Sequence, residues 1–341
     1  MSDIEYQSEI LCNRISKRYK HLKKWAKRTN VSSFRLYDRD IPEIPLAIDL
    51  YEGIPILNGE KISEKRFLPQ NCQTYLVFYL YERPYQKDEK EEQIWLNTIS
   101  LDIATLLNIS SENIILKMRK KQKGTSQYNK NEISTEKKKI LITEQGQKFI
   151  VDLSSYIDTG LFFDHRPLRK IISEKSANKS ILNLYCYTGS FSVYAASGNA
   201  KSVTSVDLSN TYINWAKENM EANGFIVNDE KYKFEVCDVV SFLKNDKNRY
   251  DIIILDPPTF SNSKKTQEDL DINRDWANLI RLCCKHLNEN GVLYFSTNSH
   301  RLKFDESLLP QGFVSYDITN LSIPEDFRNK KIHRCWEIRS K

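Results

Sequence analysis

The chain of 341 residues is long enough for two domains with separate hydrophobic cores. Its 40% hydrophobic and 28% charged residues are typical of a globular protein, and no apolar run is long enough to cross a bilayer, so we expect no membrane partner. The 7 cysteines show no metal-binding spacing, and the N-terminus does not resemble a secretion signal. These features predict free thiols, no metal site and a reducing cytoplasmic location.

The first part of the chain predicts a basic helix followed by a small α+β domain. Apolar residues recur at helical spacing from Leu11 to Ala26, and the other faces of this helix are almost purely basic. A long polar and basic loop is predicted over 119–138. We expect a helical arm over 1–35 and an RNA-binding α+β domain over 36–157. The strands and the one helix predicted after the arm are at residues 43–53, 73–83, 93–107, 113–118 and 139–143.

The net charge of +6 comes from the first part of the chain, where two basic runs dominate, "KRYKHLKKWAKR" from Lys17 and "KMRKKQK" from Lys117. Basic runs suit a polyanion, because each Lys or Arg placed against a phosphate releases a counterion. Trp25 and Tyr19 lie nearby to stack on bases. The alternative is that each basic run is simply a solvent-exposed face of the protein that binds no partner. The sequence favours neither interpretation. The residues that we expect to contact RNA are Lys17, Arg18, Lys23, Lys24, Lys27, Arg119, Lys120, Lys121 and Lys123, with Lys264 and Lys265 in a later loop.

Residues 158–341 alternate between predicted strands and helices. Such alternation is typical of an open, mostly parallel sheet with helices on both faces. The helices are expected over 211–224 and 270–287. We therefore predict an α/β, Rossmann-like domain of seven strands. These strands are expected at residues 180–187, 201–207, 232–238, 250–256, 292–298, 313–318 and 332–338.

Acidic residues occur where successive strands of this domain are predicted to end. The first strand runs into a turn at Gly189, and the next three end at Asp207, Asp238 and Asp256. In open α/β sheets, ligands bind outside the carboxyl ends of the strands. In nucleotide-binding folds, an acidic residue about 20 positions after the glycine turn bonds the ribose hydroxyls. Asp207 lies at nearly this distance from Gly189. Taken singly, each has a structural interpretation as a turn or a helix cap; together they predict a nucleoside pocket.

The pocket is expected to bind a cationic adenosine derivative rather than a nucleoside phosphate. The sequence contains no GxGxxG after the first strand and no GxxxxGK[ST]. Three carboxylates would also repel a pyrophosphate. S-adenosylmethionine carries a positive sulfonium and suits an acidic rim, so we expect it to be the cofactor.

Several segments, spread over residues 13–337, resemble a known family. They include "NRISKRYKHLKKWAKR", "DTGLFFDHRPLRKII", "LDPPTFSNSKK" and "PEDFRNKKIHRCWEI". The second domain resembles a class I S-adenosylmethionine-dependent methyltransferase. More narrowly, the chain resembles the C-terminal, guanine-N7 half of the bacterial bifunctional 23S rRNA methyltransferases, RlmKL. The N-terminal half of that family is absent, which implies a stand-alone version and raises the hypothesis of a separate partner that supplies it.

The resemblance also implies a role for individual residues. Those implied at the methionine end of the cofactor are Asp164, His165 and Arg166. Those implied in the first cofactor-binding turn are Asn183, Tyr187, Thr188, Gly189 and Ser190. Those implied around the ribose and adenine are Asp207, Leu208, Ser209 and Asp238, with Asp256 beside the transferable methyl.

The stretch Asp256-Pro257-Pro258 would form a rigid turn next to the methyl group. Proline fixes the backbone and removes amide donors, which leaves carbonyls and the Asp256 carboxylate directed into the site. Phe260 is then expected to stack on a flipped base and Thr259 to bond its edge. Asn298 would orient the guanine, although it is equally well explained as a strand-end turn residue. The residues expected to act in catalysis are Asp256, Pro257, Thr259, Phe260 and Asn298.

Guanine N7 has a free lone pair and no proton, so in-line attack on the methyl requires no general base. The predicted RNA substrate is 23S rRNA or a large-subunit precursor. One alternative, methylation of cytosine C5, needs a cysteine nucleophile. The strand after the proline motif ends in "YFSTNSH" without a thiol, and Cys283, Cys284 and Cys335 are predicted to be core residues.

Two further alternatives stay open on the sequence. Methylation of an exocyclic amine, adenine N6 or guanine N2, favours an aromatic residue directly after Asp-Pro-Pro, whereas Thr259 intervenes here. A non-catalytic RNA-binding or ribosome assembly factor could keep the same fold. Retention of Asp164, Asp207, Asp238 and Asp256 favours an enzyme.

Overall fold

The computed structural model describes residues 3–57, 59, 60, 62, 67–83, 88–119, 138–227, 230–261 and 269–341. The chain forms two compact units, and the boundary between them along the sequence lies between Thr159 and Gly160. None of the helices in these ranges is both long and apolar enough to span a membrane.

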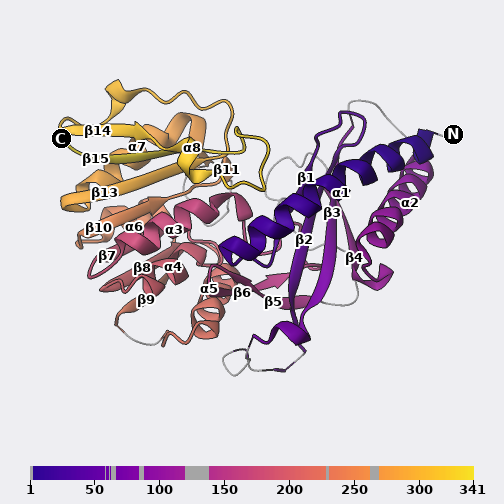
Figure 1. Ribbon diagram of the computed structural model, residues 1–341. Helices are drawn as coiled ribbons and strands as arrows, with labels where there is room; N and C mark the ends of the chain where they lie inside the picture. The colour runs from indigo at the N-terminus through magenta and orange to yellow at the C-terminus, as the bar shows by residue number, and fades with distance from the viewer. Residues whose placement is uncertain are drawn as a thin grey trace. The chain divides into compact units, whose positions relative to one another are not determined.

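The first unit is a six-stranded sheet that, in the part of the chain the structure describes, carries two α-helices (Figure 1). Its strand order is β4-β3-β2-β5-β6, with β1 paired to β2; only the β3–β4 pair is parallel. The helices are α1 (Asp3–Thr29) and α2 (Glu89–Leu107). The strands are β1 (Phe34–Asp38), β2 (Leu46–Pro55), β3 (Gln73–Tyr81), β4 (Ile114–Arg119), β5 (Lys139–Glu144) and β6 (Gln147–Asp152).

The apolar stripe of α1 packs into the core of this unit. Leu11, Ile15 and Leu22 are fully buried together with residues of β2, β3 and α2. This burial follows from the helical spacing of the apolar residues. The helix predicted as an arm is thus a structural element of the α+β unit, and its basic faces remain at the surface. The sequence pattern did not predict β1 or β6.

The second unit is an α/β domain built on seven strands, as the sequence predicted (Figure 1). The strand order is β14-β15-β13-β10-β7-β8-β9. Strands β13, β10, β7, β8 and β9 run parallel, and β14 and β15 are antiparallel additions at one edge. The strands are β7 (Ser180–Leu184), β8 (Ser202–Asp207), β9 (Tyr232–Val236), β10 (Tyr250–Leu255), β13 (Leu287–Thr297), β14 (Phe313–Asp317) and β15 (Arg334–Ser340). A short β11 (Phe260–Ser261) pairs with β12 (Leu270–Asp271).

Side chains alternate between the two faces of this sheet, and different helices cover each face. Leu182 and Leu184 share a hydrophobic core with residues of α6 and α7. Asn183, between them, points to the opposite face, where its amide donates to Ser192 of α4 at 2.9 Å. Successive side chains of a strand point to opposite faces of the sheet, so a single strand contributes to the packing on both faces. The helices are α3 (Arg166–Lys175), α4 (Ser190–Ser197), α5 (Asn210–Ala222), α6 (Val239–Asn245), α7 (Ile272–Lys285) and α8 (Thr319–Ser322).

Candidate active site

The carboxyl ends of β7 and β10 form the point at which the strand order reverses. From β7 the chain proceeds to β8 on one side, and it returns with β10 on the other side. In doubly wound sheets this switch point opens a crevice for a ligand. Asp207 is the last residue of β8, and Asp256 directly follows β10. The sheet therefore brings the predicted strand-end acids to one edge.

The turn after β7 requires a glycine at position 189. Gly189 has a φ of +73°, and a Cβ there would lie 2.7 Å from the Cβ of Ala216 on α5. Both the left-handed backbone and the close approach exclude larger residues. Thr188, beside it, is buried and donates its hydroxyl to the carbonyl of Gly160. The turn is thus anchored on both sides before any ligand binds.

The carboxylate of Asp207 is held by backbone amides at the end of β8. It accepts from the amide of Tyr187 at 3.0 Å and from that of Ser209 at 2.9 Å. Burial raises the pKa of Asp207 to about 6, although these amides act in the opposite direction. Asp207 therefore carries its charge at neutral pH, and the backbone amides offset only part of the cost of its burial.

Asp238 and Ser209 each cap a helix at the same edge of the sheet. The Asp238 carboxylate accepts from the amide of Ser241 at 2.8 Å at the start of α6. The Ser209 hydroxyl accepts from Tyr212 at the start of α5. The sequence left open a helix cap as the structural interpretation of Asp207; in the structure Ser209, not Asp207, caps α5, and Asp238 caps α6. These caps do not use all acceptor positions of either side chain.

The turn after β10 places polar and aromatic groups together. The hydroxyl of Ser296 on β13 donates to Oδ1 of Asp256 at 2.6 Å. Thr259 donates to the side-chain carbonyl of Asn298, so these two predicted residues are in direct contact. Phe260 is 44% exposed, which is high for a large aromatic residue. This side of the site thus presents an accessible ring beside a hydrogen-bonded pair.

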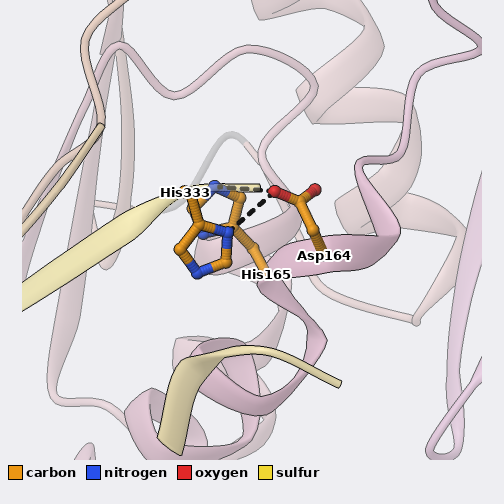
Figure 2. A group of neighbouring side chains, drawn as sticks. All are labelled: Asp164, His165 and His333. Carbon is orange, nitrogen blue, oxygen red and sulfur yellow. Dashed lines mark hydrogen bonds and ion pairs between the residues drawn. The ribbon is translucent and has the colours of Figure 1, made fainter. Parts of the chain in front are cut away.

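Asp164, His165 and His333 form a compact cluster (Figure 2). Nδ1 of His333 lies 2.9 Å from Oδ2 of Asp164, and Nε2 of His165 lies 3.7 Å from the same oxygen. Nε2 of His165 is also 3.4 Å from Oδ2 of Asp256. The pKa of His165 is lowered, mainly by burial. Sequence reasoning missed His333, whose segment "KKIHRCW" carries no recognisable ligand spacing.

The two histidine rings are arranged for stacking rather than for sharing a metal ion. Their centroids are 4.4 Å apart and their planes differ by only 8° (Figure 2). An imidazole nitrogen donates its lone pair in the plane of its ring, and two nearly parallel, stacked planes do not meet at one ion. In this arrangement the cluster is a hydrogen-bonded and ionic one.

Two predicted cofactor residues have their polar groups engaged inside the protein. Arg166 is 1% exposed, and its guanidinium pairs with Asp326 at 3.0 Å. Asn183 is likewise buried and bonded to Ser192. Among the predicted RNA contacts, Lys17, Lys23, Lys24 and Lys27 are exposed on α1, Arg18 is half-buried, and Arg119 pairs with Asp158. Lys120, Lys121, Lys123, Lys264 and Lys265 lie outside the described residues.

The cysteines near the sheet are buried and protonated. Cys283 and Cys284 belong to the hydrophobic core, and Cys335 is fully buried on β15, so the prediction that they are core residues is confirmed. Burial raises the pKa of each of these thiols, and also that of Cys186. A protonated, buried thiol is a poor nucleophile.

Comparison with known proteins identifies the family. Residues 70–309 match the S-adenosylmethionine-dependent methyltransferase family. The chain belongs to this family. The methyltransferase is 45% identical over 332 residues to ribosomal RNA large subunit methyltransferase K of Neisseria meningitidis serogroup B, an alignment that covers 96% of this chain and 86% of that protein.

Other relatives are considerably longer than this methyltransferase. It is 41% identical to ribosomal RNA large subunit methyltransferase K/L of Shewanella sediminis over 95% of its own length, but it spans only 42% of that protein. The fold matches that of SMU.776, described as a methyltransferase and solved with SAH, with a TM-score of 0.67 and 22% identity over 97% of this chain and 81% of the other. The predicted fold class is confirmed.

The methyltransferase uses S-adenosylmethionine, and the residues at the strand ends fit this cofactor. Asp207 is a half-buried acceptor, and the Asp256 side chain is 29% exposed, so both are accessible to a ligand. A positively charged sulfonium is compatible with such carboxylates, whereas a phosphate is not. The Gly189 turn adds the amino-terminal end of α4 beside them.

We predict that Arg166 acts through the stability of the methyltransferase domain. Arg166→Met should lower the free energy of unfolding by about 3–5 kcal/mol, because it leaves the Asp326 carboxylate buried without its partner. The double variant Arg166→Met/Asp326→Leu should recover most of this loss. Denaturant titration checks both values. If the single variant is as stable as the wild type but fails to bind the cofactor, Arg166 is a ligand-binding residue instead.

Proposed function

We propose that this methyltransferase transfers a methyl group to N7 of a guanine in 23S rRNA, either in the free RNA or in a large-subunit precursor. Its 45% identical relative is named for modification of large-subunit ribosomal RNA. That relative is of similar length to this chain, so the comparisons lend no support to a separate partner protein. That the chain corresponds to the C-terminal half of the K/L proteins stays a prediction.

The observation that carries the choice of N7 is the absence of a usable nucleophile or base on the Asp256 side of the site, as far as the structure describes it. The buried thiols are protonated, which disfavours attack on cytosine C6. His165 is the one imidazole close to Asp256 among the described residues, and its Nε2 faces two carboxylates, which favour a proton on that nitrogen. Methylation of an exocyclic amine would require a proton to be removed, whereas N7 has none to lose.

When bound, S-adenosylmethionine supplies an electrophilic methyl on its sulfonium. We assign the chain's residues as follows. Asp207 accepts hydrogen bonds from the ribose hydroxyls, with Leu208 and Ser209 beside it, and Asp238 meets the adenine amino group. The turn from Tyr187 to Ser190 contacts the cofactor through its backbone. Arg166 and Asn183 belong to the scaffold, because their side chains are engaged elsewhere.

The residues after β10 are assigned to the acceptor base. The exposed ring of Phe260 offers a surface for stacking, which for a flipped base contributes about 1–3 kcal/mol. The bonded pair Thr259 and Asn298 lies where it can contact the base edge. Pro257 keeps the turn rigid, and Asp256 lies beside the methyl group. Rate enhancement would then come mainly from positioning and exclusion of water.

The first experiment is a nucleoside mass-spectrometric profile of 23S rRNA incubated with the methyltransferase and labelled S-adenosylmethionine. The RNA should come from cells that lack the corresponding gene. We expect label in 7-methylguanosine, and loss of that label by about 100-fold or more in Asp256→Ala. Label in 5-methylcytidine would mean that a cysteine acts despite its burial. Label in N2-methylguanosine or N6-methyladenosine would assign the proline motif to amine recognition. No label with cofactor still bound would favour the assembly-factor hypothesis.

Cofactor affinity should depend on pH through Asp207. Its pKa is raised to about 6, so the side chain is an acceptor above that pH and becomes protonated below it. Affinity for S-adenosylmethionine should therefore be constant at neutral pH and fall by up to about tenfold per pH unit below 6. Calorimetric titration from about pH 5 to pH 8 measures this. Asp207→Asn should bind weakly and lose the pH dependence; an unchanged profile in this variant would remove Asp207 from the ribose site.

We also propose that α1 contacts the RNA backbone. A groove with a volume of about 580 Å³ runs along this helix; most of its accessible lining is apolar, and cationic side chains from α1 border it. Phosphates placed there would release counterions without any reading of sequence. The lining residues are Ile10, Asn13, Arg14, Lys17, Arg18, His21 and Ile41.

Charge reversal on α1 tests this interaction with RNA. Lys17→Glu/Lys24→Glu should weaken RNA binding by about tenfold or more, and the slope of log affinity against log salt should fall by about one for each phosphate that is no longer neutralised. Cofactor affinity should stay unchanged. Lys244→Glu/Lys247→Glu, an equal change of charge at exposed positions in the second unit, serves as the control. Equal weakening in both variants would show that only net charge matters.

A further inference from the structure

His333 is a fully engaged buried residue with no role yet assigned. It lies directly before β15 and is 1% exposed. Its Nδ1 is 2.9 Å from Oδ2 of Asp164, and its Nε2 is 2.8 Å from the hydroxyl of Ser322 at the end of α8. Both ring nitrogens thus have partners of defined chemistry.

The partners of the His333 ring bear on its protonation state. The Ser322 hydroxyl lies 2.8 Å from the carbonyl of Thr319, which can only accept, and 2.8 Å from Nε2 of His333; a hydroxyl that donates to this carbonyl accepts from Nε2. An ionised carboxylate only accepts, so Nδ1 of His333 donates to Asp164. We infer that His333 donates from both nitrogens, which makes the ring a cation paired with the half-buried carboxylate of Asp164.

His165 stacks on this cation and is kept neutral. The ring centroids are 4.4 Å apart (Figure 2), and the groups that act on His165 are Asp164, Asp256, His333 and Arg169. Burial lowers the pKa of His165 most strongly; Asp256 and Asp164 raise it, and His333 and Arg169 lower it by smaller amounts. Nδ1 of His165 is buried without a partner. A proton there would be an unsatisfied buried donor, so the proton belongs on Nε2, which faces Asp256 at 3.4 Å.

We propose that His333 is a positioning residue for Asp256, because its fixed positive charge holds Asp164 and keeps His165 neutral with Nε2–H directed at the Asp256 carboxylate. Asp256 is then oriented from two sides, by Ser296 at Oδ1 and by His165 at Oδ2. A doubly protonated His165 would neutralise the carboxylate and add charge next to a sulfonium. The proposal rests on the proposed function in one respect, namely that Asp256 acts beside the methyl group.

Nitrogen NMR of the histidine rings tests the protonation states without any need for activity. The expected spectrum at neutral pH shows His333 with both ring nitrogens protonated and His165 with a proton on Nε2 alone. A neutral His333, or a doubly protonated His165, would overturn the proposal. This measurement stands even if the mass-spectrometric profile places the methyl group on another atom.

Kinetics of His333→Gln test the consequence for catalysis. Without the cation, the pKa of His165 should rise, so the acid limb of the kcat profile should move to higher pH. At neutral pH kcat should fall by about tenfold, with KM for the cofactor changed much less. His333→Asn, which keeps a donor to Asp164 but no charge, should show the same pH shift.

The matched control is His286→Gln. His286 is also buried, and its ring nitrogens contact the carbonyls of Asn248 and Leu243 at 2.9 and 2.8 Å, at the end of α7. It should lower stability without moving the pH profile. In an Asp256→Ala background, His333→Gln should add no further loss of rate. A wild-type profile in folded His333 variants, or an additive loss in the double variant, would contradict the positioning role.

Discussion

The parallel register of β7, β10 and β13 is the constraint on which the site depends. Leu255 of β10 pairs with Leu184 of β7 on one side and with Phe295 of β13 on the other. The next residue of each strand therefore emerges at the same level, which places Asp256 beside Ser296. A shift of register by one residue would turn Asp256 into a core position, because side chains alternate between the faces.

Burial of acidic groups at this edge has an electrostatic cost that a cationic cofactor can offset. Asp207 has a raised pKa because it is partly removed from water. Asp164 is stabilised within the protein by His333, whereas Asp256 keeps partial exposure. The site thus contains two kinds of carboxylate. Asp164 is stabilised by a protein group, whereas Asp207 and Asp256 remain available to a ligand. A positively charged sulfonium benefits from the second group.

The first unit contributes a basic surface on α1. Its basic residues lie on the surface of a helix whose other side is part of a hydrophobic core, so they present charge from a rigid support. Rigid presentation reduces the conformational entropy lost on binding. The relative named K and the longer K/L relatives both align over nearly all of this chain, so both units recur together in these proteins.

The sequence by itself determined the strand-end acids, the Gly189 turn, the apolar stripe of α1 and the order of elements in the second unit. These are local patterns: strands with acidic ends, and helices with apolar residues at a fixed spacing. Tertiary structure alone decided that Asp164 meets His333, 169 positions away, and that Arg166 meets Asp326, 160 positions away. No periodicity links residues at such distances. Their pairing depends on the path of the segment before β15 across the sheet edge, which only the packed fold defines.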